Sequence, residues 1–488
     1  MARKHGRNGD GFSGGGESPF NEEGNDTTGR YIVMLREEDT KTSISSLRDE
    51  LGISHIEALE DVKESKGGPG ADNVFFPRLN AAVVDLDPDQ VSVMGRGSSH
   101  IVAAEPERYV HALAVPQSML QHGMFEPMLG VSPLEMGTEP MLPPHLQPEP
   151  RREALPSLPA GVTPEYLRGY RDSVTALIND LLSRTGRAAM PGVAMPVPAE
   201  VGIPAWNEAE ATWGLQATGV IGSSFSGQGI KVAVLDTGFG PHQDFTGRNI
   251  LARSFVQGQS PADGQGHGTH CIGTACGSQR PTVPPRYGVA YGADILVGKV
   301  LNNQGSGTDG SVLAGINWAI AQGAHVISMS LGSLVRPNEP YSQVYEIAAQ
   351  RALRQGTLII AAAGNESERP GLIQAVGRPA NCPSVVAVGA MDSAYGIAPF
   401  SCGGINPNGG EVNIVAPGVD VYSSVPMPPF YRRLRGTSMA TPHVAGIAAL
   451  FAQATGLRGL LLWQAMVRRV RPLPLPARDV GRGLVQAP

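Results

Sequence analysis

The sequence GTSMATPH at residues 436–443 places a serine directly before a stretch with the composition of a buried helix. The residues from Val444 to Phe451 are apolar or glycine, which predicts a helix that begins close to the serine. We expect Pro442 in the first turn, where its missing N–H would have no partner in any case. Ser438 would then lie at a helix N-terminus, where developing negative charge is favoured. Such a serine is either a helix cap or a nucleophile, and a nucleophile needs further groups from elsewhere in the chain.

The chain around this stretch has an α/β pattern from Trp206 onward. Short apolar runs alternate with stretches of helical periodicity, which predicts a mostly parallel sheet covered on both faces. Functional sites in such folds form at the carboxyl ends of the strands. The strands are expected at 231–235, 295–301, 324–330, 357–363, 385–390 and 412–415, and the helices at 268–276, 310–322 and 342–355.

The first 113 residues have a different organisation. Residues 1–29 are rich in glycine and polar side chains, which predicts disorder. Strands are then expected at 31–35, at 79–86 and from residue 101, with helices at 40–51 and 87–94. This alternation predicts a small α+β domain over residues 30–113.

Residues 114–200 separate this domain from the α/β region, which we take as 201–488. The segment is rich in proline and methionine and shows one amphipathic helical pattern, at about 163–186. A stripe of this kind is usually a packing surface, so we assign it no chemistry. It is interpreted as a linker.

Composition excludes several classes of protein. The net charge of −6 argues against a nucleic-acid partner, and no apolar run reaches the roughly 18 residues that a membrane span needs. Four cysteines in 488 residues do not form a disulfide framework. The N-terminus lacks the apolar core of a signal peptide. We therefore expect a cytoplasmic location, with secretion as the open alternative and the state of Cys382 and Cys402 undecided.

Asp236 ends the first strand of the α/β region in the sequence VLDTG. Asp-Thr-Gly also occurs in aspartic proteases, where two aspartates share a proton. This chain has one such motif, so that chemistry would require a homodimer. The α/β context argues against it.

His267 stands between two glycines that would leave its ring accessible. The alternatives are a helix cap, or a metal site built from His267, His270 and Cys271. The metal site would need a further carboxylate or histidine, and none is evident in the sequence. His270 and His443 are expected to be structural.

Asn365 follows a buried strand in the sequence AAAGN (361–365). Gly-Asn is common where a strand meets a turn, so a purely structural role is possible. The functional alternative is a side-chain amide directed at a developing oxyanion.

The order Asp, His, Asn, Ser resembles that of the subtilisin-like serine proteases, or subtilases. The resemblance runs from about residue 213 to 485 and includes the segment Ser330–Leu331–Gly332. It rests on the blocks KVAVLDTG (231–238), GHGTHCIGTACG (266–277), AAAGN (361–365), SVVAVGA (384–390), VAPG (415–418) and GTSMATPHVAG (436–446). It implies a three-layer α/β domain that hydrolyses polypeptides.

The resemblance also implies a role for each matched residue. Ser438 would attack the scissile carbonyl, His267 would take its proton, and Asp236 would orient the imidazole. The Asn365 amide and the Ser438 N–H would bind the oxyanion. Substrate would pair in an extended form with two backbone segments, Ser330–Leu331–Gly332 and Gly305–Ser306–Gly307, and Gly377 would lie near the floor of the pocket for the residue before the cut.

Residues 30–113 are similar to the subtilase inhibitory propeptide, which has a ferredoxin-like α+β fold. The resemblance implies that this part assists folding, blocks the site in the same chain and is removed by autocleavage. We place the cut after Leu113. The 114–200 segment departs from the family pattern, and a second cut near Ile203 is the alternative to a retained extension.

The family pattern also bears on cofactors. No cofactor is expected for the chemistry. The loop 277–287 does not match the calcium loop of many subtilases, although Asp244 could serve as a ligand. Cys271 resembles the cysteine of thiol-dependent subtilases, which implies mercurial sensitivity, or it is simply a small buried side chain. An inactive binding protein and a peptide ligase on the same scaffold stay open.

Overall fold

The computed structural model describes residues 26–53, 55–59, 73–87, 90–91, 100–113, 205–426 and 428–488. The linker 114–200 with its predicted helix lies outside the described residues, as do most of the predicted helix at 87–94 and residues 1–25. Strand β1 (Thr27–Leu35) begins three residues before the boundary predicted at Arg30, because Thr28 and Arg30 both bind Glu107.

The α/β part is built on a parallel sheet of seven strands in the order β14-β13-β12-β10-β6-β8-β7. Every neighbouring pair runs parallel. The edge strand β7 was not predicted, because its sequence ILARS mixes exposed and half-buried side chains. The strands are β6 (Lys231–Asp236), β7 (Ile250–Ser254), β8 (Asp294–Lys299), β10 (Val326–Met329), β12 (Leu358–Ala362), β13 (Val386–Met391) and β14 (Ile414–Pro417).

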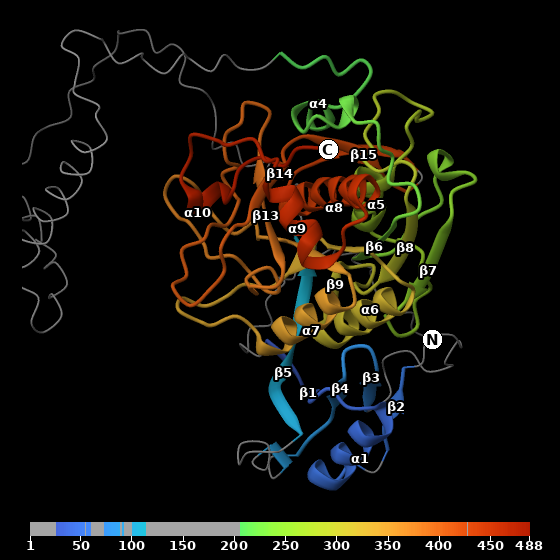
Figure 1. The fold of residues 1–488 in the computed structure, drawn as a ribbon, viewed down its shortest axis with the longest axis vertical. Helices are drawn as coiled ribbons and strands as arrows, with labels where there is room; N and C mark the ends of the chain where they lie inside the picture. The colour runs from blue at the N-terminus through green and yellow to red at the C-terminus, as the bar shows by residue number, and fades with distance from the viewer. Residues whose placement is uncertain are drawn as a thin grey trace, which may run out of the picture. The chain divides into compact units, whose positions relative to one another are not determined.

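Helices cover both faces of this sheet, which confirms the expected three-layer α/β fold (Figure 1). Helices α5 (His267–Cys276) and α8 (Thr437–Thr455) pack together on one face. Helices α6 (Asp309–Ala321) and α7 (Gln343–Arg354) cover the other. The remaining elements are α4 (Trp213–Ala217), η3 (Val220–Gly222), η4 (Gln243–Phe245), the hairpin β15 (Val421–Ser424) and β16 (Tyr431–Leu434), α9 (Gly459–Val467) and α10 (Ala477–Val480).

The N-terminal part has its own core between one helix and a sheet. The Asp39 carboxylate caps α1 (Thr40–Leu51), whose Leu47 and Leu51 are buried with Val33 and Phe75 of the sheet. The predicted strands and the helix at 40–51 are present, whereas two short strands were not predicted. The elements besides β1 and α1 are β2 (Glu57–Ala58), β3 (Val74–Phe76), β4 (Ala81–Val84) and β5 (Ile101–Ala112).

Strand β5 continues beyond this small sheet and pairs with two short strands of the α/β part. It runs antiparallel to β9 (Ser306–Thr308), with Val110 opposite Gly307. It also runs antiparallel to β11 (Leu331–Gly332), with Ala112 opposite Leu331. The end of β5 thus lies between two backbone segments that the sequence singled out for substrate binding.

The four cysteines are buried and free, and no disulfide joins Cys382 to Cys402.

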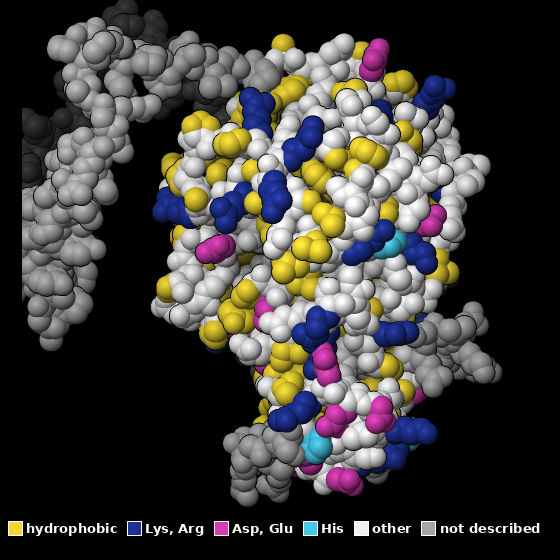
Figure 2. Space-filling model, viewed as in Figure 1, with side chains coloured by type: hydrophobic (Ala, Val, Ile, Leu, Met, Phe, Trp, Pro, Cys, Tyr) yellow, Lys and Arg dark blue, Asp and Glu magenta, His cyan; other side chains and the backbone are white. Residues whose placement is uncertain are grey.

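Among the described helices, none is by itself both long enough and apolar enough to cross a bilayer. Figure 2 shows acidic and basic side chains mixed over the part that holds α1, whereas basic side chains predominate over the part that holds α9 and α10.

Candidate active site

Asp236 is the last residue of β6, at the carboxyl end of a central strand. Its side chain is 1% exposed. Asp236 Oδ1 lies 2.8 Å from His267 Nδ1 and also accepts a hydrogen bond from the Thr237 N–H. Within the described residues, Oδ2 has no hydrogen-bond partner. The fold therefore brings together the aspartate and histidine that lie 31 positions apart in the sequence.

His267 is the first residue of α5, and the preceding Gly266 has φ 102°, a conformation that favours glycine. Its Nδ1–H donates to Asp236, so Nε2 is the ring atom left to act as a base. No described residue forms a hydrogen bond with Nε2. Burial opposes protonation of the ring, but the negative charge of Asp236 prevails and raises the pKa of His267 well above its usual value.

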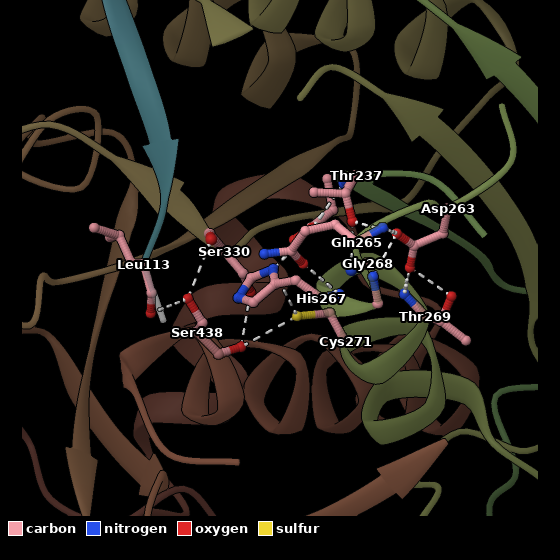
Figure 3. Close-up of polar contacts among 12 residues, drawn as sticks. Leu113, Thr237, Asp263, Gln265, His267, Gly268, Thr269, Cys271, Ser330 and Ser438 are labelled. Atoms are coloured by element: carbon pink, nitrogen blue, oxygen red, sulfur yellow. Dashed lines mark hydrogen bonds and ion pairs between the residues drawn. The ribbon is translucent and has the colours of Figure 1, made fainter. Parts of the chain in front are cut away.

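A second buried carboxylate, Asp263, joins the elements that carry these two residues (Figure 3). Its Oδ1 accepts hydrogen bonds from the Thr237 hydroxyl at 2.9 Å and from the N–H groups of Gln265 and Gly266. Its Oδ2 accepts from both the N–H and the hydroxyl of Thr269. Asp263 thus links Thr237, the residue after Asp236, to the first turn of α5 through hydrogen bonds.

Asp263 was not among the residues predicted from the sequence. It stands three residues before the N-cap Gly266, outside the position directly before a helix where a capping residue is expected, so no local signal marks it. Lys299 is also buried here, and its ammonium group donates to the Thr237 carbonyl at 2.5 Å. The Gly268 N–H donates to the Thr237 hydroxyl at 2.8 Å, which closes the network.

Ser438 is the second residue of α8, and Gly436 is the N-cap, so the serine is not the helix cap. The placement predicted for Pro442 is wrong: it is the sixth residue of the helix, in the second turn. Proline has no N–H to donate to the carbonyl four residues earlier, which is that of Ser438. The Ser330 hydroxyl at 2.8 Å and the Cys271 thiol at 3.5 Å donate to this carbonyl instead.

The carbonyl oxygen of Leu113, at the end of β5, accepts hydrogen bonds from Ser438 and Asn365. The Ser438 hydroxyl donates at 2.6 Å, and Asn365 Nδ2 is the second donor. Asn365 Oδ1 accepts from the N–H and the hydroxyl of Thr437, at 2.8 and 2.9 Å. Because Thr437 fixes the oxygen end of the amide, the nitrogen end faces Leu113.

The predicted substrate segments hold the chain that leads to Leu113. The N–H of Leu113 donates to the Ser330 carbonyl at 3.3 Å, and the N–H of Ala112 donates to the Gly305 carbonyl at 2.8 Å. A methyl group at Gly332 would lie 3.2 Å from Leu113 Cδ1. At Gly377, the nearest atoms to such a methyl group belong to Ser333 and Ala363, so its place at the pocket floor stays a prediction.

His270 and His443 both donate to backbone carbonyls. His270 donates to Val421 and Arg432, and His443 donates to Met439. Burial lowers the pKa of His270 to about 3 and that of His443 to about 4, so both rings are neutral near pH 7. These contacts agree with the structural roles expected for both.

The residues that could hold a metal ion differ from the set considered from the sequence, because Asp236 takes the place of His270. Asp236, His267 and Cys271 have buried ligand atoms within 4.8 Å of one another, whereas His270 donates to carbonyls elsewhere. A metal ion bound by these three would displace the hydrogen bond between His267 and Asp236. Burial raises the pKa of the Cys271 thiol, so it stays protonated at neutral pH.

Asp244 does not fit the calcium role considered above. Its Oδ1 accepts from the Thr282 N–H at 2.7 Å, and its Oδ2 accepts from the hydroxyls of Tyr287 and Tyr431 at 2.6 and 3.0 Å. Calcium needs several oxygen ligands, and here hydrogen-bond donors of the protein surround the carboxylate. The loop 277–287 thus supplies donors where a calcium loop would supply acceptors.

Comparison with known proteins agrees with this geometry. The family model described as the subtilase family matches residues 227–471, which include Asp236, His267, Asn365 and Ser438. Subtilisin DY of Bacillus licheniformis is 41% identical over 238 residues, which are 48% of this chain and 81% of the relative. Subtilisin Savinase of Lederbergia lenta is 41% identical over 245 residues, 49% and 84% of the two chains.

The cytoplasmic location expected above receives no support from these relatives and stays a prediction. Family and activity, in contrast, follow from the matched domain, the identities and the parallel three-layer fold together. The chain belongs to the subtilase family and is a subtilisin-like serine endopeptidase that acts on polypeptides.

Proposed function

We propose that Asp236, His267 and Ser438 form the catalytic triad of this endopeptidase. Ser438 Oγ bonds to the carbonyl carbon of the scissile peptide while its proton passes to His267 Nε2. The protonated imidazole gives that proton to the leaving amine as the C–N bond breaks. Water then repeats the sequence on the acyl-enzyme. Asp236 keeps Nδ1 protonated, so that Nε2 is the basic atom.

The observation that carries this proposal is the position of the Leu113 carbonyl oxygen. The Asn365 amide donates to it, as expected of an oxyanion-stabilising group, and the Ser438 Oγ lies 2.6 Å from it, so the nucleophile is next to the carbonyl that it would attack. In the tetrahedral intermediate that oxygen becomes negative. The Asn365 amide and the Ser438 N–H, at the N-terminus of α8, are suited to stabilise the charge.

The same contact supports a zymogen. We infer that residues 30–113 inhibit the enzyme in the same chain and that the bond after Leu113 is cut autocatalytically. The pairing of β5 with β9 and β11 fills the two segments proposed to bind substrate, so a substrate cannot enter while β5 is in place. The chemistry requires no cofactor.

Labelling with a fluorophosphonate, which reacts with activated serines, tests the triad. The purified protein should be labelled, and the Ser438→Ala variant should not. Equal labelling of both would contradict the assignment of Ser438. Intact-mass measurement of the same two proteins tests the zymogen: only the wild type should lose a fragment that ends at Leu113.

A further inference from the structure

Two glutamates of β5 precede the proposed cleavage site, in the sequence Glu105–Pro106–Glu107. Counted back from the bond after Leu113, they are the ninth and the seventh residues. Residues two apart on a strand point to the same face. Pro106 also restricts the residue before it to extended conformations. Both carboxylates therefore face the α/β part of the molecule.

Glu105 lies at the N-terminus of α7. Its Oε2 accepts a hydrogen bond from the Ser342 hydroxyl at 2.6 Å, and its Oε1 accepts from the Gln343 N–H at 2.7 Å. Arg378 Nη2 lies 3.4 Å from Oε2. All three donors belong to the catalytic part, so they would be available to another chain lying in the same groove.

Glu107 is fully buried at the N-terminus of α6. Its Oε1 accepts from the Gly310 N–H at 3.0 Å, and the Arg30 guanidinium of the N-terminal part neutralises it. A substrate would retain only the contact with Gly310. We therefore expect position seven to contribute less to recognition than position nine.

Arg378 provides an observation independent of the two helix ends. Its side chain is only 5% exposed, and its Nε has no hydrogen-bond partner among the described residues. The guanidinium lies between Glu105 and the buried carboxylate of Asp309, each 3.4 Å from Nη2. When β5 leaves, Arg378 loses Glu105 and keeps Asp309 of these two carboxylates. A buried guanidinium that has lost one of its anions favours binding of another anion.

Asp309 does not exclude such a ligand, because it contacts the bound strand as well. Its Oδ2 accepts a hydrogen bond from the backbone N–H of Arg108 at 3.0 Å, and its Oδ1 accepts from the Tyr345 hydroxyl. A backbone N–H is present in almost any sequence. This contact would align a substrate through the backbone at position six, next to position seven, without selecting the side chain there.

We propose that the N-terminus of α7, the N-terminus of α6 and Arg378 form an acidic-residue site that selects substrates. The preferred polypeptides carry Glu or Asp at the ninth residue before the cut and, more weakly, at the seventh. This inference rests on the proposed function, since it assumes that substrate follows the path of β5. It assigns to these residues a role that continues after residues 30–113 have left.

Peptides with the sequence of residues 104–113 and a fluorogenic leaving group test the proposal on the self-processed enzyme. The Glu105→Gln peptide should have a kcat/KM about fivefold lower than the parent peptide, mainly through KM, because it loses charge-assisted hydrogen bonds at one site. The Glu107→Gln peptide should show a loss of about twofold. The effect at Glu105 should shrink as salt screens the charge.

The matched control is a peptide in which Ala104 and Glu105 exchange places. Its composition and charge are unchanged, but the carboxylate faces the other side of the strand, so it should behave like the Glu105→Gln peptide. On the enzyme, Ser342→Ala should reduce the difference between the parent and Glu105→Gln peptides. Thr246→Ala, which removes an exposed hydroxyl, should leave that difference unchanged.

Equal kcat/KM for all these peptides would overturn the acidic-residue site. The proposed function would survive that result if a short peptide of residues 109–113 were still cleaved. If no peptide is cleaved, the proposed function fails, and anisotropy of dye-labelled peptides decides the site separately. Equal Kd for the parent and Glu105→Gln peptides would then overturn it.

Discussion

At the scale of single residues, Asp263 fixes the positions of Asp236 and His267 relative to each other. Every hydrogen bond it makes is an accepted one, so Asp263→Asn would turn an amide N–H₂ toward donors. We expect kcat to fall by about tenfold or more with KM within about twofold, because misplaced reacting groups slow the chemical step. Steady-state kinetics on titrated active sites measure this.

The control is Asp294→Asn, which changes a carboxylate at the start of β8 that accepts from Asn249. Its kcat should stay within about twofold of wild type. A kcat for Asp263→Asn equal to that of the control would show that Asp263 does not position the pair.

The acid limb of the pH profile depends on His267. In the proposed mechanism the ring must be neutral to accept the Ser438 proton, and the negative charge of Asp236 raises the pKa of His267 above its usual value. Activity should therefore be lost as pH falls through that raised pKa, with kcat/KM at half its maximum above pH ~6.5. A limb centred clearly below this pH would contradict the pairing of His267 with Asp236.

These roles differ in how far the sequence could predict them. Asp236, His267, Asn365 and Ser438 each stand in a short contiguous motif. Asp263 accepts most of its hydrogen bonds from residues within six positions of it, but it lies outside the N-cap position, so no helix-start pattern marks it. Arg378 acts through contacts with residues distant in the sequence, which no local pattern encodes. The same holds for Glu105, whose partners lie more than 200 positions away.

At the scale of elements, the second turn of α8 depends on Ser330. Because Pro442 cannot bind the Ser438 carbonyl, the Ser330 hydroxyl does so. Ser330→Ala should lower the free energy of unfolding by about 1–2 kcal/mol, the usual effect of leaving a buried acceptor short of a donor. Denaturant unfolding of the protein in the Ser438→Ala background measures it without self-digestion.

Ser328 of β10, two residues before Ser330, is the matched control. Its buried hydroxyl has no hydrogen-bond partner among the described residues, so Ser328→Ala should leave stability unchanged or raise it. Equal losses for both variants would indicate a volume effect rather than the hydrogen bond.

Sequence patterns predicted the central strands, but they did not predict the shortest strands or the exact start of a helix. The central strands were predictable because apolar runs of about four to six residues fill both faces of the sheet. Strands β9 and β11 are two or three residues long and form only because β5 pairs with them. The start of α8 was uncertain by a few residues, and that uncertainty placed Pro442 in the wrong turn.

At the scale of the molecule, Arg351 of α7 joins the N-terminal part to the α/β part through hydrogen bonds. Its guanidinium donates to the carbonyls of Leu35, Leu79 and Asn80. In the uncleaved Ser438→Ala protein, Arg351→Ala should speed amide exchange in β1 and β4 about tenfold, because three backbone carbonyls each lose a hydrogen bond from the guanidinium. Hydrogen exchange read by mass spectrometry reports this.

The neighbouring Arg354 offers a control, since its side chain is 56% exposed and pairs with the exposed Glu37. Arg354→Ala should change exchange in β1 and β4 by less than about twofold, as exposed ion pairs contribute little. Similar acceleration by both variants would mean that Arg351 has no special part in holding the N-terminal domain.

The pairing of β5 with β9 and β11 has a consequence for protein turnover. If substrate pairs with both segments as proposed, the groove would accept only a chain that is extended over about five residues, so helices and compact loops would be poor targets. The speed at which a folded protein is degraded would then follow how often that protein opens locally, rather than the enzyme's own turnover number. Marginally stable and damaged proteins would be degraded first.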